Sequence, residues 1–107
     1  MKARADDLDE VWKALADPTR RQILDLLRDK ACTTGEVVER FPHLSRFGVM
    51  KHLDVLRNAG LIITRAEGRK RIHTLNPVPI RQIYERWVSK YEDFWARQML
   101  GLKEDLE

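Results

Sequence analysis

Residues 44–61 read LSRFGVMKHLDVLRNAGL, and this stretch decides the fold that we expect for the rest of the chain. Ser45 suits the start of a helix, because its hydroxyl accepts hydrogen bonds from the unpaired backbone N–H groups of the first turn. Gly60 suits the left-handed conformation that ends a helix. The spacing between these two residues predicts about four turns of helix.

The two faces of this predicted helix differ in chemistry. Its apolar residues recur at three and four positions and predict one buried stripe, which consists of Val49, Leu53, Leu56, Ala59 and Gly60. The opposite face consists of Arg46, Phe47, Met50, Lys51, Asp54, Arg57 and Asn58. A helix that enters the DNA major groove touches base edges with residues of its N-terminal half, and this mixture suits that use. A core helix with a basic outer face is the alternative.

The composition predicts one soluble globular domain that spans residues 1–107. The chain is 43% hydrophobic and 35% charged, and no apolar run approaches the ~18 residues that a membrane span requires. The first ten residues, MKARADDLDE, lack the apolar segment of a secretory signal. Cys32 is the only cysteine, so no intrachain disulfide is possible. We therefore expect a cytoplasmic protein without a membrane anchor.

The positive charge is concentrated in one segment. The chain has a net charge of +3, but residues 45–75 alone contain seven cations and two anions, for a charge of +5. The rest of the chain has a charge of −2. A local excess of cations is expected for a protein that binds a polyanion, because neutralised phosphates release their condensed counterions. A solvated basic face explains the charge alone equally well.

Two helices are predicted ahead of the quoted stretch. Apolar residues at helical spacing predict the first over residues 7–16. Asp17 suits the cap of a second helix and Pro18 its first position, where the missing N–H of proline costs nothing. This second helix is expected to end near Arg28.

A third, short helix is predicted directly before the quoted stretch. Thr33 and Glu36 have the spacing of a capping box, in which each side chain bonds the backbone N–H of the other residue. Pro42 is expected to end this helix. Residues 33–60 are therefore predicted to form a helix-turn-helix, in which the third helix supports the fourth.

A two-stranded antiparallel hairpin is predicted over residues 61–75. β-Branched residues flank a turn at Gly68, which tolerates a positive φ. Three consecutive cations follow at the tip, namely Arg69, Lys70 and Arg71. A basic hairpin directly after a recognition helix is typical of a wing that lies along the phosphate backbone. We therefore expect a mainly α-helical winged helix-turn-helix.

The last helix is predicted to start at Asn76 and Pro77 and to be the longest in the chain. Five of the eight aromatic residues lie between Tyr84 and Trp95, which is more apolar surface than one small domain needs. We expect residues 1–16 and 77–107 to bury this surface in a homodimer. The predicted interface consists of Trp12, Leu15, Tyr84, Trp87, Tyr91, Phe94 and Trp95. A helix folded back on its own domain is the alternative.

The sequence resembles the ArsR-type winged-helix repressors over nearly its whole length. The resemblance rests on DPTRRQIL at residues 17–24, on LS and KHL within residues 44–53, on LRNAGL at residues 56–61 and on EGR at residues 67–69. It implies a helical core with a two-stranded wing, dimerisation through the first and last helices, and repression by binding double-stranded operator DNA. The DNA-binding residues that it implies are Ser45, Arg46, Phe47, Met50, Lys51, His52, Arg69, Lys70 and Arg71.

Phe47 and Met50 depart from the family, which more often has small or polar residues there. We expect them to contact thymine methyl groups, the only apolar feature on the floor of the major groove. Alternatively, Phe47 folds back onto the third helix near Phe41.

The sequence also lacks the metal ligands of metal-sensing relatives. The third helix has no cysteine pair, the last helix has no histidine, and Cys32 with His43 would supply two ligands where zinc needs three or four. We therefore expect no metal and no cofactor, as in the metal-independent branch of the family, and no residue pattern identifies a small-molecule inducer.

Two other functions remain as alternatives. An enzyme would need a nucleophile held by a base and an orienting acid, and no spacing in the sequence suggests one. A winged helix that binds another protein through its aromatic last helix is the stronger rival. Cations on both the recognition helix and the wing favour DNA, because a module that binds only proteins does not need them.

Overall fold

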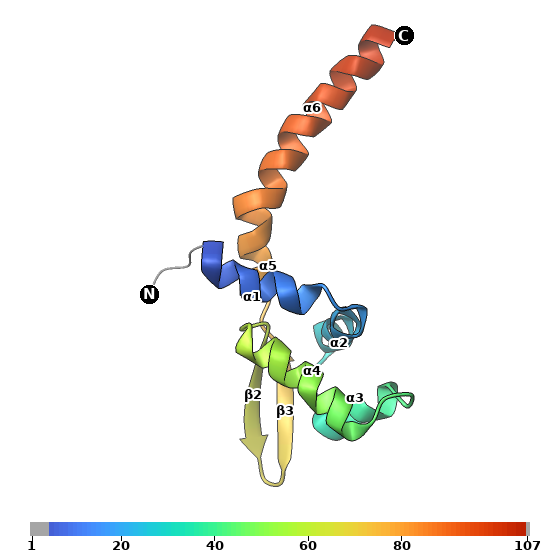
Figure 1. Cartoon of the computed structure of the whole chain (residues 1–107), viewed down its shortest axis with the longest axis vertical. Coiled ribbons are helices and arrows are strands. Elements are labelled where there is room, and N and C mark those ends of the chain that lie inside the picture. Colours follow the sequence, from blue (N-terminus) through green and yellow to red (C-terminus); the bar gives the residue numbers. More distant parts are fainter. Residues whose placement is uncertain (1–4, 107) are drawn as a thin grey trace.

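The computed structural model describes residues 5–106, and the side chains of residues 8–102. A helical body comes first, with α1 (Ala5–Leu15), α2 (Pro18–Asp29), α3 (Thr34–Arg40) and α4 (Arg46–Asn58). The strands are β1 (Cys32–Thr33), β2 (Ile62–Glu67) and β3 (Lys70–Leu75). The chain ends with α5 (Val78–Ile83), the π-helical segment η1 (Tyr84–Val88) and α6 (Ser89–Leu106). Figure 1 shows that the wing and α6 lie at opposite ends of the molecule.

The buried stripe of α4 is confirmed and lies at the centre of the core. Val49, Leu53 and Leu56 are buried and contact apolar residues of the other helices, among them Ile23 of α2 and Val37 of α3. Burial of a side chain of this size contributes about 1.5–3 kcal/mol to folding. The stripe thus fixes which face of α4 points outward.

Both ends of α4 are closed as the sequence predicts. The Ser45 hydroxyl accepts a hydrogen bond of 3.0 Å from the Gly48 N–H. At the other end Gly60 has a φ of 79°, its N–H donates to Arg57, and the Leu61 N–H donates to Leu56. These two bonds form a Schellman motif, which satisfies the last carbonyls of the helix. The helix consequently ends at a defined point from which the wing starts.

The predicted starts of α2 and α3 are also confirmed. The Asp17 carboxylate accepts from the Arg20 N–H at 3.0 Å, and this bond lowers the pKa of Asp17. Thr33 and Glu36 form the reciprocal capping box, with bonds of 3.1 and 2.8 Å. The first helix, expected over residues 7–16, is α1 (Ala5–Leu15).

The sheet has three strands, so the prediction of a two-stranded wing is wrong. The strand order is β1–β3–β2, and all pairs are antiparallel. Cys32 pairs with His73 and Thr33 with Ile72. The extended backbone of Thr33, which the cap of α3 requires, also allows it to join the ladder. Two residues are too few to show an alternating pattern, so the sequence identified the cap and missed the strand.

The predicted hairpin with its turn at Gly68 is confirmed. β2 pairs with β3 from Ile62 opposite Leu75 to Glu67 opposite Lys70. Gly68 lies in the connecting turn with a φ of 63°. Arg69 lies in the same turn, and Lys70 and Arg71 begin β3, so the three cations lie at the tip of the hairpin.

The sequence suggested one regular α-helix at the end of the chain, but the structure has α5, a π-helical segment and α6 there. The Ser89 N–H donates to the carbonyl of Tyr84, five residues earlier, and the Ser89 hydroxyl donates to the Glu85 carbonyl at 3.2 Å. The hydroxyl thus occupies the carbonyl that the Ser89 N–H would bond in an α-helix. The start is also different from the prediction, because Pro77 precedes α5 and Asn76 bonds both the Val78 N–H and the Gly60 carbonyl.

α6 extends away from the rest of the molecule (Figure 1). The radius of gyration is 17.8 Å, whereas a compact domain of ~100 residues has a value of about 13 Å. In the described part of the chain, only the preceding segment η1 makes extensive contact with α6. The helices there are too short or too polar to cross a membrane. Within residues 5–106, the apolar face of α6 therefore lacks an extensive partner beyond η1.

His73 is buried in the middle of the sheet, and its pKa is lowered. Burial is the main cause, and Arg57 and Arg71 add to it, while Asp54 acts in the opposite direction. Protonation of His73 is therefore less favourable in the folded than in the unfolded chain. Stability from this group is complete above the unfolded pKa of about 6.5 and is lost as the pH falls below it.

We accordingly predict that the free energy of unfolding decreases as the pH falls from 7 towards 5. One proton limits the slope to about 1.4 kcal/mol per pH unit. Urea titrations at several pH values measure this slope, and a His73→Gln variant is expected to flatten it. Replacement of the exposed His43 by Gln is the control and is expected to leave the slope unchanged. An equal pH dependence in the His73 variant would contradict the assignment.

Candidate nucleic-acid interface

The outward face of α4 presents the side chains predicted for base contact. Phe47 is 71% exposed and Met50 is 45% exposed. The Lys51 ammonium lies over the Phe47 ring, 5.5 Å from its centroid, in a cation–π contact. Phe41 is instead buried in the core, and its ring lies beside His43. The alternative in which Phe47 folds back towards Phe41 is therefore wrong.

Three elements form a hollow of about 370 Å³ beside this face, which we call the basic basin. The start of α3 contributes Thr33, Thr34 and Gly35, α4 contributes Arg46 and Met50, and the wing contributes Arg69, Lys70 and Arg71. No carboxylate lines it, and among the described residues none of its four cations forms an ion pair. By contrast, Arg57 is paired with Asp54 and Arg65 with Glu67. Among the described residues, residues 45–75 thus have five cations without an ion pair, and all of them except Lys51, which lies over the Phe47 ring, line the basin.

The third strand explains why the basin exists. The ladder between β1 and β3 holds the wing against the residues that begin α3. The cap at Ser45 starts α4 so that Arg46 and Met50 face the same hollow. Four cations around one concave surface, none of them in an ion pair among the described residues, attract a phosphate group. The sequence predicted the four cations and missed the contribution of Thr33, Thr34 and Gly35, which the unrecognised strand β1 brings there.

Two of the predicted DNA-binding residues have partners within the protein. Ser45 caps α4. The His52 side chain is 22% exposed, and its Nδ1 lies 3.4 Å from the Arg20 guanidinium and 3.9 Å from the Asp17 carboxylate. His52 therefore packs at the junction of α4 with the start of α2. Its contact with DNA stays a prediction, as does that of Ser45.

Five of the residues predicted for a dimer interface form two groups of aromatic contacts. Trp12 of α1 meets Trp87 edge to face at 5.7 Å, and Trp87 lies 5.0 Å from Tyr91. Phe94 and Trp95 are in edge contact at 5.2 Å. We call these five side chains the aromatic surface. Each is about half exposed, whereas Leu15 is packed against the core.

The aromatic surface continues in both directions. A groove of about 480 Å³ between α1 and η1 is lined by Leu8, Asp9, Trp12, Arg86 and Trp87. Beyond Trp95, the exposed side chains of Met99, Leu100 and Leu102 extend the apolar character of α6. Tyr84 is positioned beside the surface by a 2.7 Å hydrogen bond from its hydroxyl to Glu92, which raises its pKa.

Cys32 and His43 have different surroundings and do not belong to a group of potential metal ligands among the described residues. The Cys32 thiol is buried and donates to the Lys30 carbonyl at 3.6 Å, and burial raises its pKa. His43 lies on the surface beside Phe41. The described residues include no group of three potential ligands. Cys32 is thus part of the core and of strand β1.

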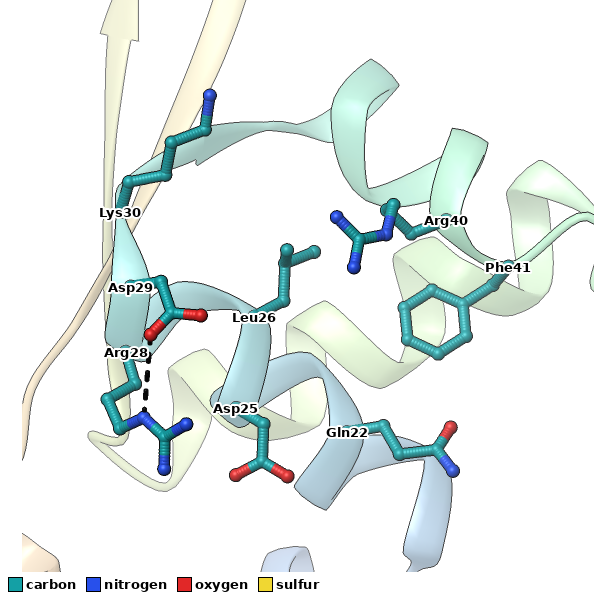
Figure 2. Close-up of a pocket in the computed structure, with 8 residues that line it drawn as sticks. All are labelled: Gln22, Asp25, Leu26, Arg28, Asp29, Lys30, Arg40 and Phe41. Atoms are coloured by element: carbon teal, nitrogen blue, oxygen red, sulfur yellow. Dashed lines mark ion pairs between the residues drawn. The ribbon is translucent and has the colours of Figure 1, made fainter.

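A second hollow, of about 500 Å³, lies between α2 and α3 and was not suggested by the sequence. Figure 2 shows Leu26 at its centre, with the Arg40 guanidinium pointing into it and Gln22 at the rim. Its charges have both signs, and Arg28 is paired with Asp29 at 3.6 Å. This mixture of charges distinguishes it from the basic basin, whose charged residues are all cations.

Comparison with known proteins identifies relatives over most of the chain. A family profile described as a helix-turn-helix domain matches residues 15–65. The HTH-type transcriptional regulator Rv2034 of Mycobacterium tuberculosis is 34% identical over 93 residues, which cover 87% of this chain and 82% of the relative. The transcriptional repressor SdpR of Bacillus subtilis is 38% identical over 64% of this chain and 76% of its own. The transcriptional activator HlyU of Vibrio cholerae is 36% identical over 68% and 67%.

The fold has solved counterparts as well. The crystal structure of an ArsR family transcriptional regulator superposes with a TM-score of 0.78 at 30% sequence identity. The superposition covers 90% of this chain and 97% of the other. The similarity thus includes the wing and extends beyond the 51 positions of the family profile.

The exposure of Phe47 and Met50 leads to a test of base contact. We predict that each thymine they face contributes through its methyl group, so that its loss costs about 1–3 kcal/mol of binding free energy. Binding is measured on a selected DNA site and on the same site with uracil in place of thymine. Met50→Ser and Phe47→Ala are expected to abolish the preference for thymine. Equal binding of both sites by the unmodified protein would contradict methyl recognition.

Proposed function

Because this chain belongs to the ArsR family of helix-turn-helix transcriptional regulators, we propose that it represses transcription by binding a palindromic operator as a homodimer. Binding of double-stranded DNA to regulate transcription is the function of the family, which is not a class of enzymes. Three parts of this proposal go beyond the function of the family: repression, the palindromic symmetry of the operator and the homodimer.

The basic basin is the observation on which the proposal depends most. It combines cations from the recognition helix and from the wing, and the described residues leave all four without an ion pair. Arg46 begins the exposed face of α4, so a phosphate in the basin would place Phe47 and Met50 beside the bases. The basin would therefore set the register of the helix in the groove.

A homodimer follows from the length of α6 and from the needs of recognition. The 18 residues of α6 extend over about 27 Å, and an isolated helix with this much exposed apolar surface is marginal in water. One recognition helix reads few base pairs, whereas two related by a twofold axis read half-sites roughly 34 Å apart. We infer that the aromatic surfaces of two copies pack against each other.

Repression is supported by the mode of binding. A helix-turn-helix dimer that occupies a promoter would exclude the polymerase from it. The relatives include one named as a repressor and one named as an activator, so a reporter assay decides the sign. Expression of the protein is expected to lower transcription from a promoter that contains the selected site. An increase would contradict repression.

We also propose that no metal controls DNA binding, as in the metal-independent branch. Cys32 lies in the core with its thiol bonded to a backbone carbonyl, which leaves it unsuited to ligate an ion from solvent. The inducer, if the protein has one, would act elsewhere. The rival proposal, a module that binds only proteins, gives no role to the basin.

The wing is predicted to supply affinity without sequence preference. Selection of bound DNA from a random pool first identifies the operator. Arg69→Ala with Lys70→Ala is then expected to weaken binding to all sequences alike, and to reduce the slope of log affinity against log salt by about one per lost contact in each half-site. Arg28→Ala, beside the hollow of Figure 2, is the control. Loss of one preferred base at an unchanged slope would show that the wing reads sequence.

The dimer is predicted to dissociate when its apolar surface receives a charge. Light scattering is expected to give twice the chain mass of 12.6 kDa for the unmodified protein and the single mass for Trp95→Lys. Ala96→Lys, one position along the helix and about 100° around it, is the matched control and is expected to stay dimeric. A monomer mass for the unmodified protein at micromolar concentration, unchanged by operator DNA, would contradict the dimer.

A further inference from the structure

His73 is the one buried polar side chain among the residues whose burial the structure describes. It is 2% exposed, and both of its ring nitrogens have a partner. Nε2 lies 2.8 Å from the hydroxyl of Thr34, and Nδ1 lies 2.9 Å from the hydroxyl of Thr64. A neutral imidazole donates from one nitrogen and accepts at the other, so either tautomer satisfies both hydroxyls.

These three residues belong to three different elements. Thr34 is the first residue of α3, Thr64 lies on β2, and His73 lies on β3 between the other two strands. Backbone pairing already joins Cys32 and Thr64 to His73 from either side. The bond to Thr34 adds a direct connection from the wing to the helix-turn-helix, and the bond to Thr64 joins the two strands of the wing and orients the His73 ring. Such paired bonds are directional, and they hold an orientation that apolar packing alone would leave adjustable.

The same connection joins the two walls of the basic basin. Thr34 lines the basin from the side of α3, and Arg71, two residues before His73, lines it from the wing. Three of the four cations of the basin lie on the wing and the fourth, Arg46, lies on α4, so their repulsion favours movement of the wing away from the helix-turn-helix. A fixed link just behind these walls opposes that separation in the absence of DNA.

We propose that His73 is a positioning residue for DNA binding, which fixes the wing against the start of α3 and so holds the wing cations in place around the basic basin. The inference rests on the proposed binding of DNA by the basin. His73 itself touches no DNA and acts through Thr34, Thr64 and the wing cations. Because the wing is already fixed before DNA binds, a phosphate can enter the basin without ordering the wing, and the entropic cost of binding is lower.

The test removes the two hydrogen bonds one at a time. Thr64→Val and Thr34→Val keep the shape of the side chain and delete the hydroxyl, whereas a substitution at His73 risks unfolding the sheet. Thr74→Val is the matched control, because Thr74 lies on the same strand as His73 and is exposed. Fluorescence anisotropy measures binding to a labelled random-sequence duplex of about 30 base pairs at two salt concentrations. The random duplex reports phosphate contacts whatever the operator is.

A double-mutant cycle then separates positioning from general stability. Each variant is measured alone and together with Arg69→Ala and Lys70→Ala. We expect Thr64→Val and Thr34→Val to weaken binding about threefold to tenfold and to reduce the salt slope, but to have little further effect once the wing cations are gone. Thr64→Ser, which restores the hydroxyl, is expected to recover the affinity. The control at Thr74 is expected to change nothing in either background.

Two results would overturn the inference. One is unchanged affinity and salt slope in Thr64→Val and Thr34→Val. The other is the same fold loss with and without the wing cations, because the bonds would then act through overall stability and not through the wing. Failure of the unmodified protein to bind the duplex at either salt concentration would instead contradict the proposed function. Binding by the unmodified protein thus tests the proposed function, and the comparison of the variants tests the role of His73.

Discussion

The ladder of Cys32 and Thr33 with Ile72 and His73 is the constraint on which the rest of the interface depends. A hairpin joined to its domain only through its two ends would be free to twist, and an isolated two-stranded ribbon is marginal in water. The third strand fixes β3 against the start of α3, and α3 packs on α4. Recognition helix and wing therefore move as one body, and their cations share one concave surface.

Much of this fold follows from local rules that the sequence states clearly. Caps at Asp17, Thr33 and Ser45 and the glycine at residue 60 act within four residues along the chain, so each can be recognised without knowledge of the tertiary structure. The buried stripe of α4 is equally clear, because its spacing matches one helical face. The cations of the wing were predicted for the same reason, since a hairpin turn places its neighbours at the tip.

The remainder depends on contacts between distant residues. Strand β1 exists because β3 lies beside it, with paired residues 39 and 41 positions apart in the chain, and two residues contain no pattern of their own. The link from His73 to Thr34 likewise spans 39 positions. For His52 the sequence allowed either a phosphate or the end of a neighbouring helix as partner, and its contacts with Asp17 and Arg20 at the start of α2 are known only from the structure. The π-helical segment could not be predicted from the sequence, because apolar residues spaced at three and four positions suit an α-helix and a π-helix alike.

The π-helical segment also has a consequence for how such regulators diverge. It adds one residue to a helical turn between α5, which is anchored in the core through Ile83, and α6. One residue corresponds to a rotation of about 100° around the helix axis. A deletion that restored the regular helix would turn every aromatic side chain of α6 by that angle, without any change to α4 or the wing. Two copies joined through the rotated face would hold their recognition helices at another distance and angle. A single-codon change far from the DNA could thus select operators with a different spacing between identical half-sites.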